Sequence, residues 1–248
     1  MATICPNILV GNTGEENQNF LWLNNPDRPG HFIDATEDGL PQIADNTQGI
    51  ALADLDDDGD LDMVVANEDP PNRLYLNDGN ANFTDHSDRL ELVTPLETRQ
   101  VYVRDFTGDG SLDILFFNLT SNAGEWEKDP QIRLLVDNGE GRYVDESAER
   151  MPENKFSVYA GAPVDLNRDG SLDLIFGPIE IPGFSPMQYR AYINDGKGNF
   201  TDQTDAYIPD QSTGRGWGMA VGDLNGDNLN DILVGGWGTQ ARLLMPAE

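Results

Sequence analysis

The chain has 248 residues, of which 44 are acidic and 15 are basic, so its formal net charge at pH 7 is −29. A surface this acidic repels the phosphate backbone, and we therefore expect no nucleic-acid partner. No apolar run approaches the roughly 20 residues that a membrane-spanning helix needs, so we expect no membrane insertion. Cys5 is the only cysteine, which excludes an internal disulfide and a cysteine-rich metal site.

The main feature of the sequence is an Asp-rich segment that occurs four times. The copies begin at Asp54, Asp105, Asp165 and Asp223, so successive copies start 51, 60 and 58 residues apart. In every copy the first, fifth and ninth residues are Asp, and the third is Asp, Thr or Asn. A period of this length indicates an array of similar structural units.

Each Asp-rich segment lies between short apolar segments that are typical of β-strands. Strand a precedes it at 50–53, 101–104 and 219–222, and strand b follows it at 63–66, 114–117, 174–177 and 232–235. Strand c begins at Arg73, Arg133, Arg190 or Arg242, and strand d is predicted at 82–85, 142–145 and 199–202. The repeating unit is therefore strand a, Asp-rich loop, strand b, connection, strand c, turn and strand d.

These units predict an all-β fold, a β-propeller of about five blades in a single domain covering residues 1–248. Three four-stranded units are complete, whereas the N-terminal stretch supplies strands b, c and d and the C-terminal stretch strands a, b and c. The predicted units are about 1–36, 45–88, 96–147, 156–205 and 215–248. Two three-stranded ends do not add up to one four-stranded blade. The alternative is an open fragment that closes by self-association or was cut from a longer chain.

The Asp-rich loops have the composition of a calcium site. Ca²⁺ binds six to eight oxygens, and side chains at the first, third, fifth and ninth residues, with a backbone carbonyl at the seventh, can supply them. An EF-hand needs Glu at the twelfth residue and a following helix. Here the twelfth residues lie in apolar strands and are Val65, Phe116, Phe176 and Val234, which excludes that motif. Magnesium is the weaker alternative, and an Asp-Gly on its own would be read as an ordinary turn.

We expect about four structural calcium ions, one in each loop. The predicted ligands are Asp54, Asp56, Asp58, Asp60 and Asp62; Asp105, Thr107, Asp109, Ser111 and Asp113; Asp165, Asn167, Asp169, Ser171 and Asp173; and Asp223, Asn225, Asp227, Leu229 and Asp231. The second site should bind more weakly, because Thr107 offers only a hydroxyl. The fourth should also be weaker, because Asn228 replaces the turn glycine of its siblings.

The four loops, together with three Asn-Asp-Gly-like turns that each precede a strand ending in Asp, resemble the FG-GAP or VCBS repeat of the integrin α-subunit propeller. The similarity covers nearly the whole chain. It implies a calcium-binding propeller with structural Ca²⁺ at the loop positions, and an extracellular, cell-surface or periplasmic location, although the first residues show no signal peptide. The resemblance leaves the activity open, because the family includes adhesion modules, lectins and polysaccharide lyases.

Catalytic motifs are scarce. His31 and His86 are not spaced as a metal-binding pair, and the sequence has no nucleophile elbow, phosphate-binding loop or dinucleotide fingerprint. We therefore expect a binding module, lectin-like or adhesive, that recognises a carbohydrate or a protein. The alternative is an enzyme of the polysaccharide lyase type that uses Tyr, Arg and carboxylate groups in a cleft.

The ligand is expected on the face opposite the calcium loops, where the long b–c segments 118–130 and 178–188 lie. The residues six positions before each loop start the innermost strands and should ring the channel mouth on that face. With two further tryptophans, they make up the candidate ligand residues: Gln48, Arg99, Tyr159, Trp217, Trp126 and Trp237. A plug of the channel is the alternative role. The arginines that begin strand c lie near the same face, where salt bridges or an anion site would explain them.

Overall fold

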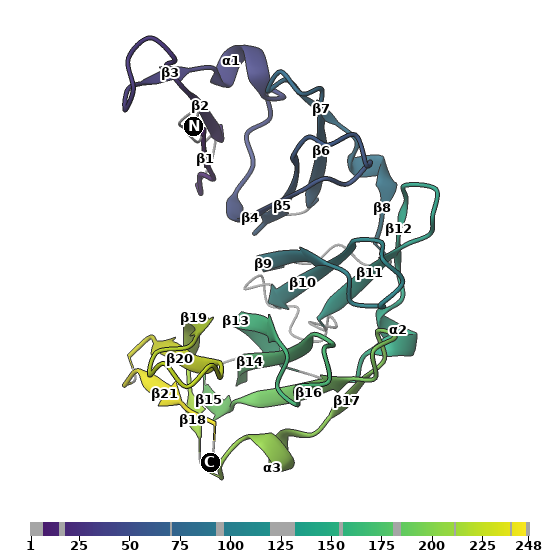
Figure 1. The fold of residues 1–248 in the computed structure, drawn as a ribbon, viewed down its shortest axis with the longest axis vertical. Coiled ribbons are helices and arrows are strands. Elements are labelled where there is room, and N and C mark those ends of the chain that lie inside the picture. Colours follow the sequence, from purple (N-terminus) through teal and green to yellow (C-terminus); the bar gives the residue numbers. More distant parts are fainter. Residues whose placement is uncertain are drawn as a thin grey trace.

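The computed structural model describes residues 7–14, 18–69, 71–92, 97–119, 132–153, 156–180, 185–210, 212–238 and 240–246. The fold is all-β, as predicted, and its sheets follow one another along an open arc (Figure 1). The N-terminal sheet lies at one end of this arc and the C-terminal sheet at the other. In the described part of the chain, no helix has the length and apolar character needed to cross a bilayer.

The first sheet contains β1 (Ile8–Val10), β2 (Phe20–Asn24) and β3 (Phe32–Asp34). The second contains β4 (Thr47–Ala53), β5 (Asp62–Asn67), β6 (Arg73–Asn77) and β7 (Phe83–Asp85). The third contains β9 (Glu97–Arg104), β10 (Asp113–Leu119), β11 (Arg133–Asp137) and β12 (Tyr143–Asp145), with β8 (Leu90–Glu91) parallel to β12.

The fourth sheet contains β13 (Ser157–Val164), β14 (Asp173–Glu180), β16 (Arg190–Asn194) and β17 (Phe200–Asp202), extended by β15 (Ser185–Gln188) and β18 (Thr213–Gly214). The fifth contains β19 (Gly216–Gly222), β20 (Asp231–Gly236) and β21 (Arg242–Leu244). The antiparallel strands a to d lie where the loop spacing predicted them. The first sheet shows b, c and d, and the last shows a, b and c.

Alternating side chains of each sheet fill the cores on either side of it. In β5, Val64 packs toward the third sheet, whereas Met63 and Val65 pack toward the first. Four apolar clusters arise in this way, one between each pair of neighbouring sheets. Each fully buried Val, Leu or Phe stabilises the fold by about 1.5–3 kcal/mol relative to exposure.

The innermost strands approach one another closely at glycines. A Cβ on Gly49 in β4 would lie 3.3 Å from the carbonyl oxygen of Arg99 in β9. A Cβ on Gly177 in β14 would lie 2.9 Å from the Cα of Gly216, which begins β19. Because both neighbours are backbone atoms, a side chain there would force the strands apart.

A polar staple that the sequence analysis did not predict fixes the outer rim of each of the first four units. In the second unit, Asp85 accepts hydrogen bonds from the backbone N–H of Ser87 at 2.9 Å and from its hydroxyl at 2.5 Å, while that hydroxyl accepts from the N–H of Leu74 at 3.1 Å. The same contact to strand c recurs at Thr36, Ser147 and Thr204. These residues begin the short helices η1 (Ser87–Arg89), α1 (Thr36–Gly39), α2 (Ser147–Arg150) and α3 (Thr204–Tyr207).

One predicted loop is wrong. The segment 178–188 was expected to be an irregular b–c connection, but β14 continues to Glu180 and β15 pairs with it through Ile179 and Pro186. The extension holds because β15 also pairs with β18, where Met187 lies opposite Gly214. Most of the other long segment, 118–130, lies outside the described residues, as do its Trp126 and, in 178–188, Phe184.

Candidate functional site

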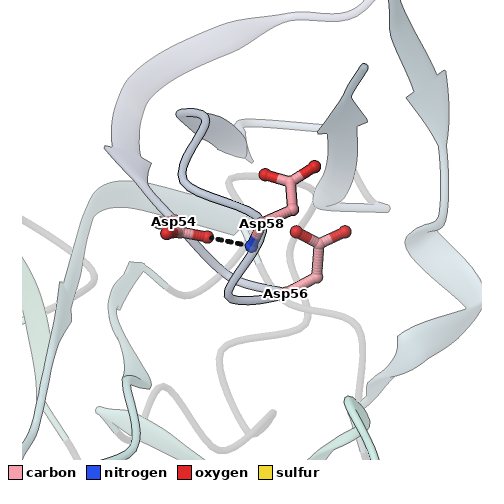
Figure 2. A group of neighbouring side chains, drawn as sticks. All are labelled: Asp54, Asp56 and Asp58. Carbon is pink, nitrogen blue, oxygen red and sulfur yellow. Dashed lines mark hydrogen bonds between the residues drawn. The ribbon is translucent and has the colours of Figure 1, made fainter. Parts of the chain in front are cut away.

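Each Asp-rich loop joins strand a to strand b at the same end of its sheet. In the first loop, between β4 and β5, the carboxylates of Asp54, Asp56 and Asp58 come together (Figure 2), and one oxygen from each lies within 4.8 Å of the others. Asp60 and Asp62 are not part of this group. Burial, followed by the negative charge of Asp58, raises the pKa of Asp56. A divalent cation would relieve that repulsion.

All four loops share one hydrogen-bonding scheme. The first Asp accepts two backbone N–H groups from its own loop; Asp54, for example, accepts those of Asp58 at 3.1 Å and Gly59 at 3.0 Å. The fifth Asp accepts the N–H two residues on, as Asp58 does from Asp60 at 2.9 Å. Equivalent bonds form in the other loops at Asp105, Asp109, Asp165, Asp169, Asp223 and Asp227. These hydrogen bonds to backbone N–H groups fix the shape of each loop.

The backbone enters the left-handed region twice in each loop. The sixth residue has a positive φ in all four, including 64° at Asn228, as expected of a glycine position. The fourth residue does too, and there the sequence places Asp57 at 60° and Arg168 at 63°. This second position was not predicted from the sequence, although glycine occupies it in the other two loops, with φ of 73° at Gly108 and 83° at Gly226.

The ninth Asp of each loop is fully buried and ties the loop to its own sheet. One oxygen of Asp62 accepts the N–H of Leu55 at 2.8 Å and the other that of Asn77, in strand c, at 2.8 Å. Asp113 and Asp173 make the same two contacts, and burial raises the pKa of all three carboxyls. In Asp62 each oxygen keeps a second lone pair for a ligand, whereas in Asp113 one oxygen also accepts the N–H of Thr107 at 3.0 Å.

The fourth loop differs at this contact. Asp231 accepts the N–H of Leu224 at 2.9 Å, but its other oxygen is buried and has no hydrogen-bond partner among the described residues. The position that matches Asn77 is Pro246, which has no N–H to donate. A buried acceptor left unsatisfied costs about 1–3 kcal/mol, so the last unit is less well tied than the others.

The four residues predicted at the channel mouth lie near the opposite ends of the a strands and form part of one row. Glu68, directly after β5, accepts hydrogen bonds from Gln48 and from Arg99, each at 2.8 Å. The guanidinium carbon of Arg99 lies 5.1 Å from the centroid of the Tyr159 ring. The row thus links the second, third and fourth sheets through polar and cation–π contacts.

An aromatic cluster continues the row onto the fifth sheet. Tyr159 stacks on Trp217 with ring centroids 4.3 Å apart, and Trp237 lies 5.1 Å from Trp217. The guanidinium carbon of Arg215 lies 5.6 Å from the Trp237 ring. Trp217 and Trp237 are 50% and 51% exposed, so these indoles present broad surface to solvent.

Glu68 and Arg215 are members of this row that the sequence did not predict, whereas Trp237 was among the predicted ligand residues. Glu68 and Trp237 occupy the same place in their units, directly after strand b, and counting from the ninth Asp would have paired them. Arg215 precedes β19 and has no acidic partner within ion-pair distance among the described residues. Burial raises the pKa of Tyr159 even with Arg99 nearby, so its phenol is protonated at neutral pH and is a poor general base.

The arginines that begin strand c are explained by ion pairs in the three complete units. Arg73 pairs with Asp45 at 3.0 Å and more distantly with Asp85, and Arg190 pairs with Asp202 at 2.9 Å. Arg133 lies 3.8 Å from Asp145. The last unit has no strand d, and its Arg242 donates to the carbonyl of Thr213 at 3.0 Å. The salt-bridge interpretation therefore accounts for these positions.

Comparison with known proteins finds the same repeat. The model of the FG-GAP-like repeat matches residues 6–65, 54–116 and 165–234. Cartilage acidic protein 1 of Xenopus tropicalis is 30% identical over 171 residues, which cover 65% of this chain and 25% of that protein. The human protein of the same name is 30% identical over 166 residues, covering 65% and 24%. The chain therefore aligns with about a quarter of the length of these relatives. Since the repeat model matches well over half of the chain, this protein belongs to the FG-GAP-like repeat family.

Proposed function

We propose that this chain is a calcium-stabilised binding module whose five sheets are propeller blades and whose ligand, a carbohydrate, binds on the face opposite the calcium loops. The observation that carries the proposal is the row from Gln48 to Trp237, because its members come from four different sheets and end in two half-exposed indoles. Proteins of the family to which the chain belongs are typically binding or adhesion modules.

The calcium part of the proposal rests on the donor set. Three carboxylates that converge in the first loop repel one another, and Ca²⁺ prefers such hard oxygen ligands at 2.3–2.6 Å. The other three loops repeat the backbone scheme with Thr or Asn at the third position. Calcium sites of extracellular modules fill at roughly 10⁻⁴–10⁻³ M calcium, and an extracellular location is part of the proposal.

Calorimetric titration with calcium separates a metal site from a simple turn. Asp58→Asn keeps an oxygen that can accept the N–H of Asp60 and removes only the charge. If the loop binds calcium, this variant loses heat of binding and affinity at one site. A titration identical to that of the unchanged protein would mean that Asp58 only shapes the turn.

The ligand part rests on the aromatic surface. An indole offers an apolar face to the C–H side of a sugar ring and an N–H to a hydroxyl. A channel plug would be buried, whereas Trp217 and Trp237 are about half exposed. The nearby guanidinium of Arg215 can donate to hydroxyl or carboxylate oxygens of the same ligand.

A glycan array probed in calcium, and again with a chelator, tests the proposal directly. Binding to at least one glycan class should appear and should weaken in Trp237→Ala. The matched control is Tyr207→Ala, which removes an exposed aromatic ring from α3 on the outer rim. No binding to any glycan would refute the carbohydrate ligand. Turnover of a bound polysaccharide would favour the enzyme alternative instead.

A further inference from the structure

The two ends of the arc carry the same apolar positions that bury the contacts between its sheets. We call the side of a sheet that packs on the following sheet its trailing face, and the side that packs on the preceding sheet its leading face. In the second sheet, the trailing face includes Val64, Leu74 and Leu76, and the leading face includes Met63 and Tyr75. Each of the four internal interfaces joins a trailing face to a leading face.

The trailing faces of the first four sheets are buried within the chain. Their three shared positions are occupied by Leu9, Leu21 and Leu23; Val64, Leu74 and Leu76; Leu115, Leu134 and Val136; and Ile175, Ala191 and Ile193. In the second sheet their exposed fractions are 0%, 0% and 8%. In the fifth sheet the matching residues are Leu233, Leu243 and Met245, which are 45%, 47% and 50% exposed. This face carries the apolar residues of an interface, and the described residues leave it exposed.

The leading face of the first sheet is partly covered: Ile8, Val10 and Trp22 are half-buried, and Phe32 is exposed. Its positions match Met63, Val65, Tyr75 and Phe83 of the second sheet, which are at most 9% exposed. In the first sheet they hold Ile8, Val10, Trp22 and Phe32. Phe32 is 42% exposed, and Phe20, which stacks on Trp22 with centroids 6.0 Å apart, is 36% exposed.

We propose that two copies of this chain associate head to tail. The leading face of the first sheet in one copy covers the trailing face of the fifth sheet in the other. The four interfaces inside the chain support this contact, because each of them pairs a trailing face with a leading face. Apolar patches on this scale are uncommon on isolated soluble proteins and mark interaction sites. Because the two faces differ, the contact is heterologous, so repeating it gives a ring or a filament.

The net charge of −29 sets how the contact should respond to salt. Two copies repel one another over distances that salt screens, whereas the burial of leucine and aromatic side chains does not weaken with ionic strength. Association should therefore strengthen as salt or calcium is added.

Sedimentation velocity of the 248-residue chain in calcium, over a wide range of concentration, tests the proposal. The unchanged protein should form species of at least twice the monomer mass. Leu233→Asp with Leu243→Asp removes the trailing face, and Val10→Asp with Trp22→Asp removes the leading face. Each double variant should be at least ~10-fold weaker in association, as expected when central apolar contacts are lost. Tyr207→Asp, an exposed aromatic residue on neither face, is the control and should associate like the unchanged protein.

Mixing the two double variants gives the decisive result. Each keeps one intact face, so each alone should be monomeric, and the mixture should form a one-to-one pair that grows no further. A trailing-face variant that still associates alone would show a contact between like faces and would overturn the proposal. An unchanged protein that stays monomeric at every concentration would also overturn the proposal, because the end faces would then not bind a second copy. Circular dichroism and the calcium-dependent melting midpoint identify variants that fail to fold. For those, Leu233→Ser and Trp22→Ser give the same comparison.

Discussion

The residues at one end of the innermost strands are nearly the same in every unit, whereas those at the other end differ from unit to unit. At one end, the four loops keep Asp at the first, fifth and ninth residues and share one hydrogen-bonding scheme. At the other end, the four equivalent residues are Gln48, Arg99, Tyr159 and Trp217, which share no chemistry. Strand β4 alone separates Gln48 from Asp54, a rise of about 20 Å at 3.3 Å per residue.

The difference shows which part of the unit the fold requires. The loop must turn the chain through two left-handed residues and return it to strand b, so its residues are constrained in every copy. Residues at the far end of strand a contact neighbouring sheets, as Arg99 does with Glu68 and Tyr159 with Trp217. Since no backbone requirement fixes them, they are free to suit a ligand.

The largest expected effect is at the loop end, where removing calcium should lower stability strongly. One site filled at 100 times its Kd contributes about 2.7 kcal/mol, which is ~5–10 °C in a domain of this size. Thermal melting with calcium and with EDTA measures the sum over all sites. An unchanged midpoint would mean that the loops are turns only, and the contrast between the two ends would lose its physical basis.

The next effect compares two loops. Asp58→Ala and Asp227→Ala remove equivalent side chains, each of which accepts the N–H two residues on, at 2.9 and 2.8 Å. The lost turn bond is therefore matched, and Asp227→Ala also removes a hydrogen bond that Asp227 accepts from the side-chain amide of Asn225 at 2.8 Å. The first loop has four Asp at its side-chain ligand positions, whereas the fourth has three and Asn225. Asp58→Ala should cost more of the calcium-induced rise in melting temperature. Equal or reversed losses would contradict this ranking.

Local patterns predicted the strands well because each strand is specified by its own residues. The apolar segments after Asp62 and Asp113 became β5 and β10, and the missing strands at both ends were foreseen. Contacts between units were harder to predict. Nothing near Glu68 in the sequence indicates that it joins Gln48 to Arg99, because that depends on how closely neighbouring sheets approach. The two contacts of the ninth Asp lie within its own unit and were not predicted either, because they depend on how the loop folds back onto strand c.

At the end of strand a where the residues differ between units, a substitution should affect ligand binding without affecting stability. Trp217→Ala should abolish glycan binding while changing the calcium-dependent melting midpoint by little, since the indole is half exposed and lies far from the loops. A buried plug would instead leave a cavity costing roughly 3–5 kcal/mol. Melting and binding are measured on the same preparation. Lost stability with intact binding would show that Trp217 supports the fold and is not part of a ligand site.

The smallest effect exchanges one residue between loops. The sixth position has φ of 94° at Gly59 and 64° at Asn228, and only glycine adopts such values without strain from a Cβ. Asn228→Gly should therefore stabilise the calcium-loaded fourth loop, by up to ~1 kcal/mol after the greater freedom of glycine in the unfolded chain is subtracted. Gly59→Asn should cost a similar amount in the first loop. Chemical unfolding in calcium measures both, and Gly222→Asn, at the end of β19, controls for the loss of a glycine outside the turn. If both exchanges are neutral, the loops differ in their ligands alone, and the weaker fourth site must be attributed to Asn225 and to the unsatisfied oxygen of Asp231.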